Sequence, residues 1–173
     1  GTATITLVVA ADDQTERTTN SFGLTVIPVN DPPSFDLSTN LVSVMEDVPL
    51  QKLTNFVINI SKGPTNEASQ TVTFKVTPAD PALFAGLPSI SPSGLLSFTP
   101  KTNMNGSSLV TVVMTDSGGT ALAGSNQAPT QTFTVTVNAR NDAPLITGLK
   151  AVTISEDTSA NIMSILIFNG YIP

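Results

Sequence analysis

Carboxylate and amide side chains carry most of the chemistry that this chain could perform. Its 173 residues include thirteen Asp and Glu residues but no His, no Cys and no Trp. Without His or Cys there is no Ser-His or Cys-His nucleophile pair, no imidazole or thiolate metal site and no disulfide. Oxygen ligands remain, and they suit a hard cation such as calcium, which takes about six to eight of them. The residue inventory therefore argues against an enzyme and leaves calcium as the possible cofactor.

Other partners are disfavoured by charge and by hydropathy. Asp12 and Asp13 are adjacent, but a glycosidase pair needs a cleft and a raised pKa on one carboxyl, so an exposed turn is the better interpretation. The net charge of -6 has the wrong sign for nucleic acid. The longest apolar stretch, residues 162–168, is far shorter than the roughly 20 residues that span a bilayer. We expect no nucleic acid partner and no membrane span.

The elements that must position these side chains are predicted to be strands. In Thr132 to Val137, every second residue is apolar, which is the pattern of a half-buried strand. Turn residues such as Asn105-Gly106 separate the alternating segments. Pro78, Pro81, Pro88 and Pro92 predict that residues 80–92 are irregular, because proline is rare inside a sheet. The predicted strands are residues 40–45, 50–60, 70–77, 94–99, 108–115 and 131–138, with Phe35, Phe56, Phe74, Phe98 and Phe133 in the core.

Short strands separated by turns predict an all-β antiparallel sandwich, and two motifs recur at the interval of one such domain. Asn30-Asp31-Pro32-Pro33 recurs 111 residues later as Asn141-Asp142-Ala143-Pro144. Glu46-Asp47 recurs 110 residues later as Glu156-Asp157. We therefore expect residues 1–33 to be the last strands of one repeat, 34–144 a complete repeat, and 145–173 the first strands of a third.

Four segments of the sequence resemble bacterial cadherin-like (Ig-like) tandem repeats of large surface and secreted proteins. They are residues 58–74, 94–100, 115–120 and 134–144, and the resemblance covers essentially the whole chain. It implies Greek-key β-sandwiches joined end to end, some of them rigidified by calcium at the junctions.

The resemblance also implies the ligands of such junctions. At the first junction these are Asn30 and Asp31 with Asn66, Glu67 and Asp116, and at the second Asn141 and Asp142 with Glu46. Two acidic motifs of animal cadherins have no counterpart here, because Asn59-Ile60-Ser61 replaces one and residues 94–100 lack the other. The alternative is structural: Asn30 and Asp31 shape a turn, Glu46 is a solvated strand residue, and Asp116 caps a turn.

The sequence thus predicts a structural, non-catalytic segment of an extracellular or cell-surface protein: a stalk, an adhesin segment or a filament subunit. Its partners would be neighbouring repeats of the same or identical chains, with a head-to-tail filament formed by strand exchange as one form. Residues 1–33 and 145–173 are together too few to complete a whole sandwich. The alternative function is an adhesion module that presents loops such as residues 121–130 to a glycan or a cell-surface protein.

Overall fold

The structure, a computed structural model, describes residues 1–12 and 16–143. The predicted third segment, residues 145–173, lies outside them. Within the described part the chain is all-β, with several small sheets and three short 3-10 turns. None of the helical segments in that part is long and apolar enough to cross a membrane.

The largest sheet has four strands in the order β4 (Leu41–Met45), β11 (Gln131–Asn138), β10 (Gly106–Asp116) and β7 (Val72–Pro78). Strands β11, β10 and β7 pair antiparallel, whereas β4 runs parallel to β11. Alternation fixes which face is buried: in β11 the inward residues are Phe133, Val135 and Val137. The alternation predicted from the sequence is therefore confirmed in this strand.

Two smaller sheets and three turns complete the folded unit, by which we mean residues 34–138. One sheet pairs β3 (Ser34–Leu37) with β6 (Val57–Ser61). The other has the order β5 (Gln51–Leu53), β9 (Leu96–Pro100) and β8 (Phe84–Ile90). The 3-10 turns are η1 (Thr65–Glu67), η2 (Pro81–Leu83) and η3 (Ala121–Ala123).

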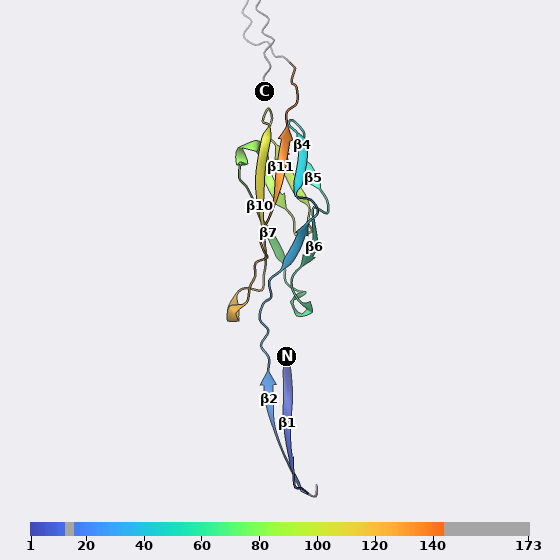
Figure 1. Cartoon of the computed structure of the whole chain (residues 1–173), viewed down its shortest axis with the longest axis vertical. Coiled ribbons are helices and arrows are strands. Elements are labelled where there is room, and N and C mark those ends of the chain that lie inside the picture. Colours follow the sequence, from blue (N-terminus) through green and yellow to red (C-terminus); the bar gives the residue numbers. More distant parts are fainter. Residues whose placement is uncertain (13–15, 144–173) are drawn as a thin grey trace, which may run out of the picture.

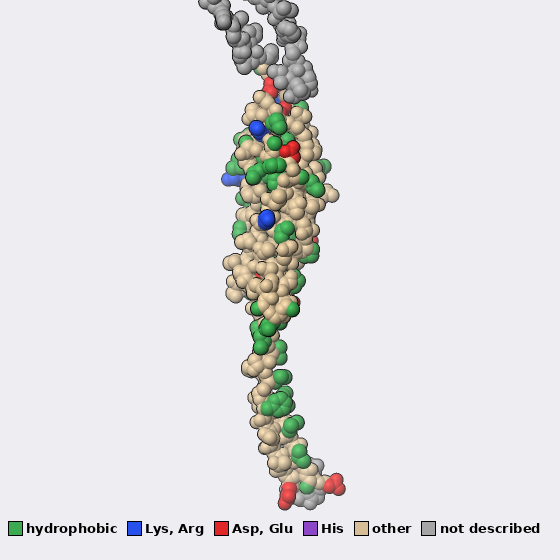
Figure 2. Space-filling model, turned by 90° about the vertical axis from the view of Figure 1, so that its left-hand side faces the viewer, with side chains coloured by type: hydrophobic (Ala, Val, Ile, Leu, Met, Phe, Trp, Pro, Cys, Tyr) green, Lys and Arg blue, Asp and Glu red, His purple; other side chains and the backbone are tan. Residues whose placement is uncertain are grey.

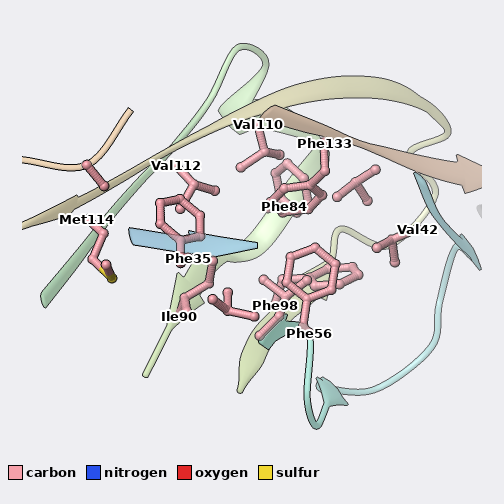
Figure 3. Close-up of a cluster of buried hydrophobic side chains, with 14 of the residues drawn as sticks. Phe35, Val42, Phe56, Phe84, Ile90, Phe98, Val110, Val112, Met114 and Phe133 are labelled. Carbon is pink, nitrogen blue, oxygen red and sulfur yellow. The ribbon is translucent and has the colours of Figure 1, made fainter. Parts of the chain in front are cut away.

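Side chains from the three sheets of the folded unit share one hydrophobic core (Figure 3). Phe56 and Phe133 meet edge to face at 4.7 Å between ring centroids, an arrangement that aromatic pairs prefer. Phe35 and Phe98 are also buried, and Phe74 packs against the cluster from β7. The five phenylalanines predicted for the core are therefore confirmed.

The prediction for residues 80–92 is wrong, because β8 occupies residues 84 to 90 of that segment. The strand tolerates Pro88 because β8 is the edge strand of its sheet, where a missing N–H leaves no partner unpaired. Its pairing with β9 is also irregular on both sides of Gly86. The predicted strand 50–60 is in fact two strands, β5 and β6, which belong to different sheets.

A hairpin of β1 (Thr2–Ala10) and β2 (Arg17–Thr25) extends away from one end of the folded unit, opposite the end at which β11 terminates (Figure 1). Every residue of both strands is exposed. Hydrophobic side chains follow one another along it (Figure 2). Its apolar alternation is therefore not matched by burial within the described residues.

Candidate functional site

Glu67 lies at the end of the folded unit that faces the hairpin. There it holds the linker, residues 26–33, which joins the hairpin to the folded unit. The side chain belongs to η1 and is only 5% exposed. Its Oε1 accepts a hydrogen bond of 2.9 Å from the backbone N–H of Asp31. Its Oε2 is buried and has no hydrogen-bond partner among the described residues. A buried carboxylate oxygen without a partner is costly, so this atom marks a place where a positive group would be favourable.

Asn30 and Asp116 form a hydrogen-bonded network beside Glu67. Asp116 ends β10, is 8% exposed, and its Oδ1 accepts from Asn30 Nδ2 at 3.1 Å and from the Gly118 N–H at 2.8 Å. Asn30 Oδ1 in turn accepts from Gln70 Nε2 at 2.7 Å. Asp116 Oδ2 and Gln70 Oε1 are buried and have no hydrogen-bond partners in the part of the chain that the structure describes. We call Asn30, Asp31, Asn66, Glu67, Gln70 and Asp116 the N-terminal cluster; Asn66 lines the same small hollow as Asn30, Glu67 and Gln70.

Two glycines make room for this cluster. A Cβ on Gly118 would collide with Asn30 Oδ1 and lie 2.5 Å from Gln70 Nε2. A Cβ on Gly63, whose φ is +119°, would collide with Glu67 Oε2. Both collisions involve oxygens of the cluster, so the absence of a side chain at these positions is what allows the oxygens to converge.

Glu46 binds the chain that leaves the folded unit at its opposite end. It directly follows β4 and is only 2% exposed. Its Oε1 accepts a hydrogen bond of 2.7 Å from the backbone N–H of Arg140, and its Oε2 is buried without a partner up to residue 143, where the described part of the chain ends. Its own N–H donates to Asn138 O at 2.9 Å, which continues the parallel β4–β11 ladder. Glu46 is therefore not the solvated strand residue of the structural alternative.

Two further carboxyls lie beside Glu46, and with it and Arg140 they form what we call the C-terminal cluster. Asp47 has a φ of 61°, and its Oδ1 accepts from the Asn103 N–H at 3.2 Å. Partial desolvation and the neighbouring Asp47 carboxyl raise the pKa of Asp142 above its usual value. Glu46 raises it further, whereas Arg140 opposes the rise. The carboxyls of this cluster thus repel one another.

The structure brings most of the predicted ligands together, each at the end of the unit where it was expected. Asn30, Glu67 and Asp116 are linked through side chains, whereas Asp31 joins them through its backbone N–H. Asn141 lies exposed in the segment between Arg140 and Asp142. Asp116 also caps its turn as the structural alternative predicted, because its Oδ1 accepts from Gly118.

Sequence reasoning missed Gln70 and Asp47. Asp47 had a signal, since Glu46-Asp47 is repeated as Glu156-Asp157. No sequence signal pointed to Gln70, because its hydrogen bond to Asn30 forms only when the fold brings together residues that are 40 positions apart in the sequence.

These clusters can supply oxygen ligands but little else. In residues 1–12 and 16–143, no three His, Cys, Asp or Glu side chains converge in an arrangement that could hold a metal by themselves. The N-terminal cluster offers two buried carboxylates, those of Glu67 and Asp116, and the amide oxygens around them, which is a weak, hard-cation donor set. Comparison with protein-family models and with curated proteins finds no match to this chain.

Proposed function

We propose that this chain is a structural, non-catalytic segment of an extracellular or cell-surface repeat protein of bacterial cadherin-like type, with calcium stiffening its junctions. One observation carries the proposal: at each end of the folded unit a buried glutamate accepts from a linker N–H, and its second oxygen has no hydrogen-bond partner in residues 1–12 and 16–143. The repeated Asn-Asp motif lies in both linkers, residues 26–33 before the folded unit and residues 139–143 after it. A linker held by the domain at both ends suits a rod whose function is spacing and assembly.

The strand order supports the proposed Greek-key sandwich. Strand β4 comes early in the folded unit yet pairs in parallel with its last strand, β11. Strands β10 and β11 are antiparallel neighbours, and the smaller sheets add residues to the same core from β3, β6 and β9. Two groups of strands around one core, joined by crossing connections, are the ordinary form of a sandwich domain. A tandem array of such units is the arrangement that the repeated motifs favour.

Buried oxygen atoms of the N-terminal cluster support calcium as the cation of this proposal. Glu67 Oε2, Asp116 Oδ2 and Gln70 Oε1 are buried oxygens without hydrogen-bond partners among the described residues, and the absence of a side chain at Gly63 leaves room for Glu67 Oε2. Glu67 and Asp116 would hold the ion with the amide oxygens of Asn30, Asn66 and Gln70. When bound, the cation would neutralise two buried negative charges. With only two carboxylates, we expect a dissociation constant of about 10⁻⁴ to 10⁻³ M, the range of extracellular calcium modules.

Loop contacts favour this structural role over the presentation of residues 121–130 to a ligand. Ser125 donates its N–H to Asn30 O at 3.0 Å, and Ser125 O accepts from Asn30 Nδ2 at 2.6 Å. These hydrogen bonds hold the loop against the linker at the end of the folded unit that faces the hairpin (Figure 1). Leu122 nevertheless remains exposed, so a ligand-binding role for this loop stays the second candidate.

Thermal melting of the full chain in calcium and in chelator tests the proposal. With 10 mM calcium and the dissociation constant above, binding should stabilise the folded unit by about 1.4 to 2.7 kcal/mol. For a unit of this size that raises the melting temperature by roughly 6 to 11 °C.

Glu67→Gln should remove most of this rise without lowering the melting temperature in chelator, because it also removes a buried, uncompensated charge. Asp36→Asn is the matched control, since Asp36 is an exposed carboxylate outside both clusters. A wild-type chain that melts at the same temperature in both solutions would exclude the cation.

A further inference from the structure

The outward side of the four-stranded sheet carries almost no charge. We call it the outer face: the residues of β4, β11, β10 and β7 that alternate with the inward-facing ones and point away from the core. All four strands lie in the described part of the chain, and Lys75 is the one charged residue of this face. Most of the other residues are Thr or Ser. The face contains no Asp and no Glu, although the chain has a net charge of -6.

A short apolar row crosses the outer face from β10 to β4. Thr134 of β11 is registered with Leu109 on one side and with Leu41 on the other. Leu109 is 51% exposed and Leu41 is 53% exposed, so both leucines present a large apolar surface to solvent. Because association is driven mainly by the burial of apolar surface, this row is the part of the face whose covering is most favourable.

Several polar side chains of the outer face hydrogen-bond to one another across neighbouring strands. The pairs are Thr73 with Thr115 at 2.9 Å, Ser107 with Thr136 at 3.1 Å, and Asn138 Nδ2 with Ser43 Oγ at 2.8 Å. A covered polar group that keeps its hydrogen bond costs far less free energy than one that loses its partner. A second surface can therefore displace water from this face without leaving these groups unpaired.

The absence of acidic residues favours a second copy of the chain as the partner of this face. A strongly acidic or basic partner finds few complementary charges on it. Two copies of this chain repel each other, since each has a net charge of -6, and they keep their acidic residues apart when they meet through the outer face. The row is also self-complementary, because a leucine lies on either side of Thr134.

The area of the outer face fits a weak dimer. With a rise of about 3.3 Å per residue and a strand spacing of about 4.8 Å, the four strands cover about 500 Å² in the plane of the sheet. Two copies would therefore bury about 1,000 Å² in all, which is near the lower limit for a specific interface. We expect a dissociation constant in the micromolar range and not a permanent dimer.

We infer that the outer face packs against the outer face of a second copy, with a two-fold axis over Thr134 that lays one apolar row over the other. The two sheets would then lie about 10 Å apart, as in packed sandwiches. This pairing goes beyond the proposed function, because the outer face runs along the side of the folded unit (Figure 1), whereas the two acidic clusters lie at its ends. In the rod that we propose, it would join neighbouring rods side by side.

Sedimentation equilibrium of the full chain in chelator tests this pairing separately from the calcium junctions. Leu109→Lys removes an apolar contact from the row and adds a charge that the interface cannot pair, so it should weaken dimerisation at least tenfold. Leu87→Lys is the matched control, since Leu87 is 57% exposed and lies in β8, which belongs to another sheet. It should change the dissociation constant by less than about twofold. Melting curves verify that both variants fold.

Crosslinking tests the position of the axis, since the native sequence contains no Cys. Thr134→Cys places one thiol of each copy beside the axis, within reach of a short bis-maleimide. The expected product is a covalent dimer without larger species, because a two-fold contact uses the face once in each copy. Ser89→Cys is the control, since Ser89 is exposed on β8, away from the outer face, and should give little covalent dimer.

A higher salt concentration should strengthen the wild-type dimer, because salt screens the repulsion between two copies of charge -6. A dimer that salt weakens would show that charged groups outside the outer face hold the copies together, which would overturn the inference. So would a wild-type chain that stays monomeric into the high micromolar range, equal weakening by the two lysine substitutions, or equal crosslinking of the two cysteine variants. A melting temperature that calcium does not raise would count against the proposed junctions alone.

Discussion

At the scale of single residues, Asn30 keeps its place because residue 118 has no side chain. A methyl group at Gly118 would displace Asn30 Oδ1, which accepts from Gln70, and disturb the bond from Asn30 Nδ2 to Asp116. We expect Gly118→Ala to lower the free energy of unfolding in chelator by about 1 to 2 kcal/mol, because buried hydrogen bonds are lost. The same substitution should reduce the stabilisation by calcium.

Paired melting curves in calcium and in chelator measure both effects. Gly23→Ala is the control, because a Cβ on Gly23 meets nothing within 4 Å. If Gly118→Ala melted like the wild-type chain in both solutions, Asn30 would not be held as described.

Residue chemistry was partly predictable from the sequence. The resemblance to bacterial cadherin-like repeats implied which end of the unit Glu46, Glu67 and Asp116 would each occupy. Their burial was not predictable, because an acidic residue in an alternating sequence is normally exposed. For Glu67 and Glu46 it depends on backbone donors at Asp31 and Arg140, which only the folded linkers supply.

At the scale of elements, the turn between β8 and β9 depends on Gly94. Its φ is +84°, a region that residues with a Cβ rarely adopt, and a Cβ there would collide with the carbonyl oxygen of Val57. Its own carbonyl accepts from the N–H groups of Phe56 and Val57 at 3.1 Å. The turn therefore ties the β8–β9 hairpin to the start of β6.

We expect Gly94→Ala to lower the free energy of unfolding by about 2 to 4 kcal/mol, because backbone strain and a backbone collision act together. Urea unfolding measures the loss, with Gly119→Ala as the control for φ alone, since Gly119 has a φ of +82° but open space at its Cβ. Equal losses in the two variants would show that the contact with Val57 has no importance.

Elements were predicted well where alternation was strong and poorly where proline or a short break dominated. Strands β7, β9, β10 and β11 match their predicted ranges within about two residues. Strand β8 was missed because Pro88 indicates an interruption in the sequence, whereas in the fold it lies on a sheet edge that needs no donor there. Pairing partners are a tertiary property, so the sequence could not show that β5 and β6 join different sheets.

At the scale of the whole molecule, the β10–β11 pair covers a core, whereas the β1–β2 pair covers none among the described residues. Phe133 in β11 is 1% exposed and Phe22 in β2 is 54% exposed. Phe133→Ala should lower the free energy of unfolding by about 3 to 5 kcal/mol, because it opens a cavity beside Phe56. Phe22→Ala, measured at low protein concentration, should change the free energy of unfolding by less than about 0.5 kcal/mol.

Urea unfolding of both variants at submicromolar concentration makes the comparison. A large loss in Phe22→Ala under these conditions would mean that the hairpin is covered within a single copy. The domain bounds drawn from the repeated motifs stay a prediction, since they concern the arrangement of repeats along a longer array.

The parallel pairing of β4 with β11 determines how the unit would respond to tension. Force that enters through β4 and leaves through β11 would slide two neighbouring strands past each other along their length. The five registered pairs from Leu41–Thr134 to Met45–Asn138 would then share the load and break together, not in succession. A string of such units would lengthen under load in abrupt steps, each step being the rupture of one β4–β11 pair.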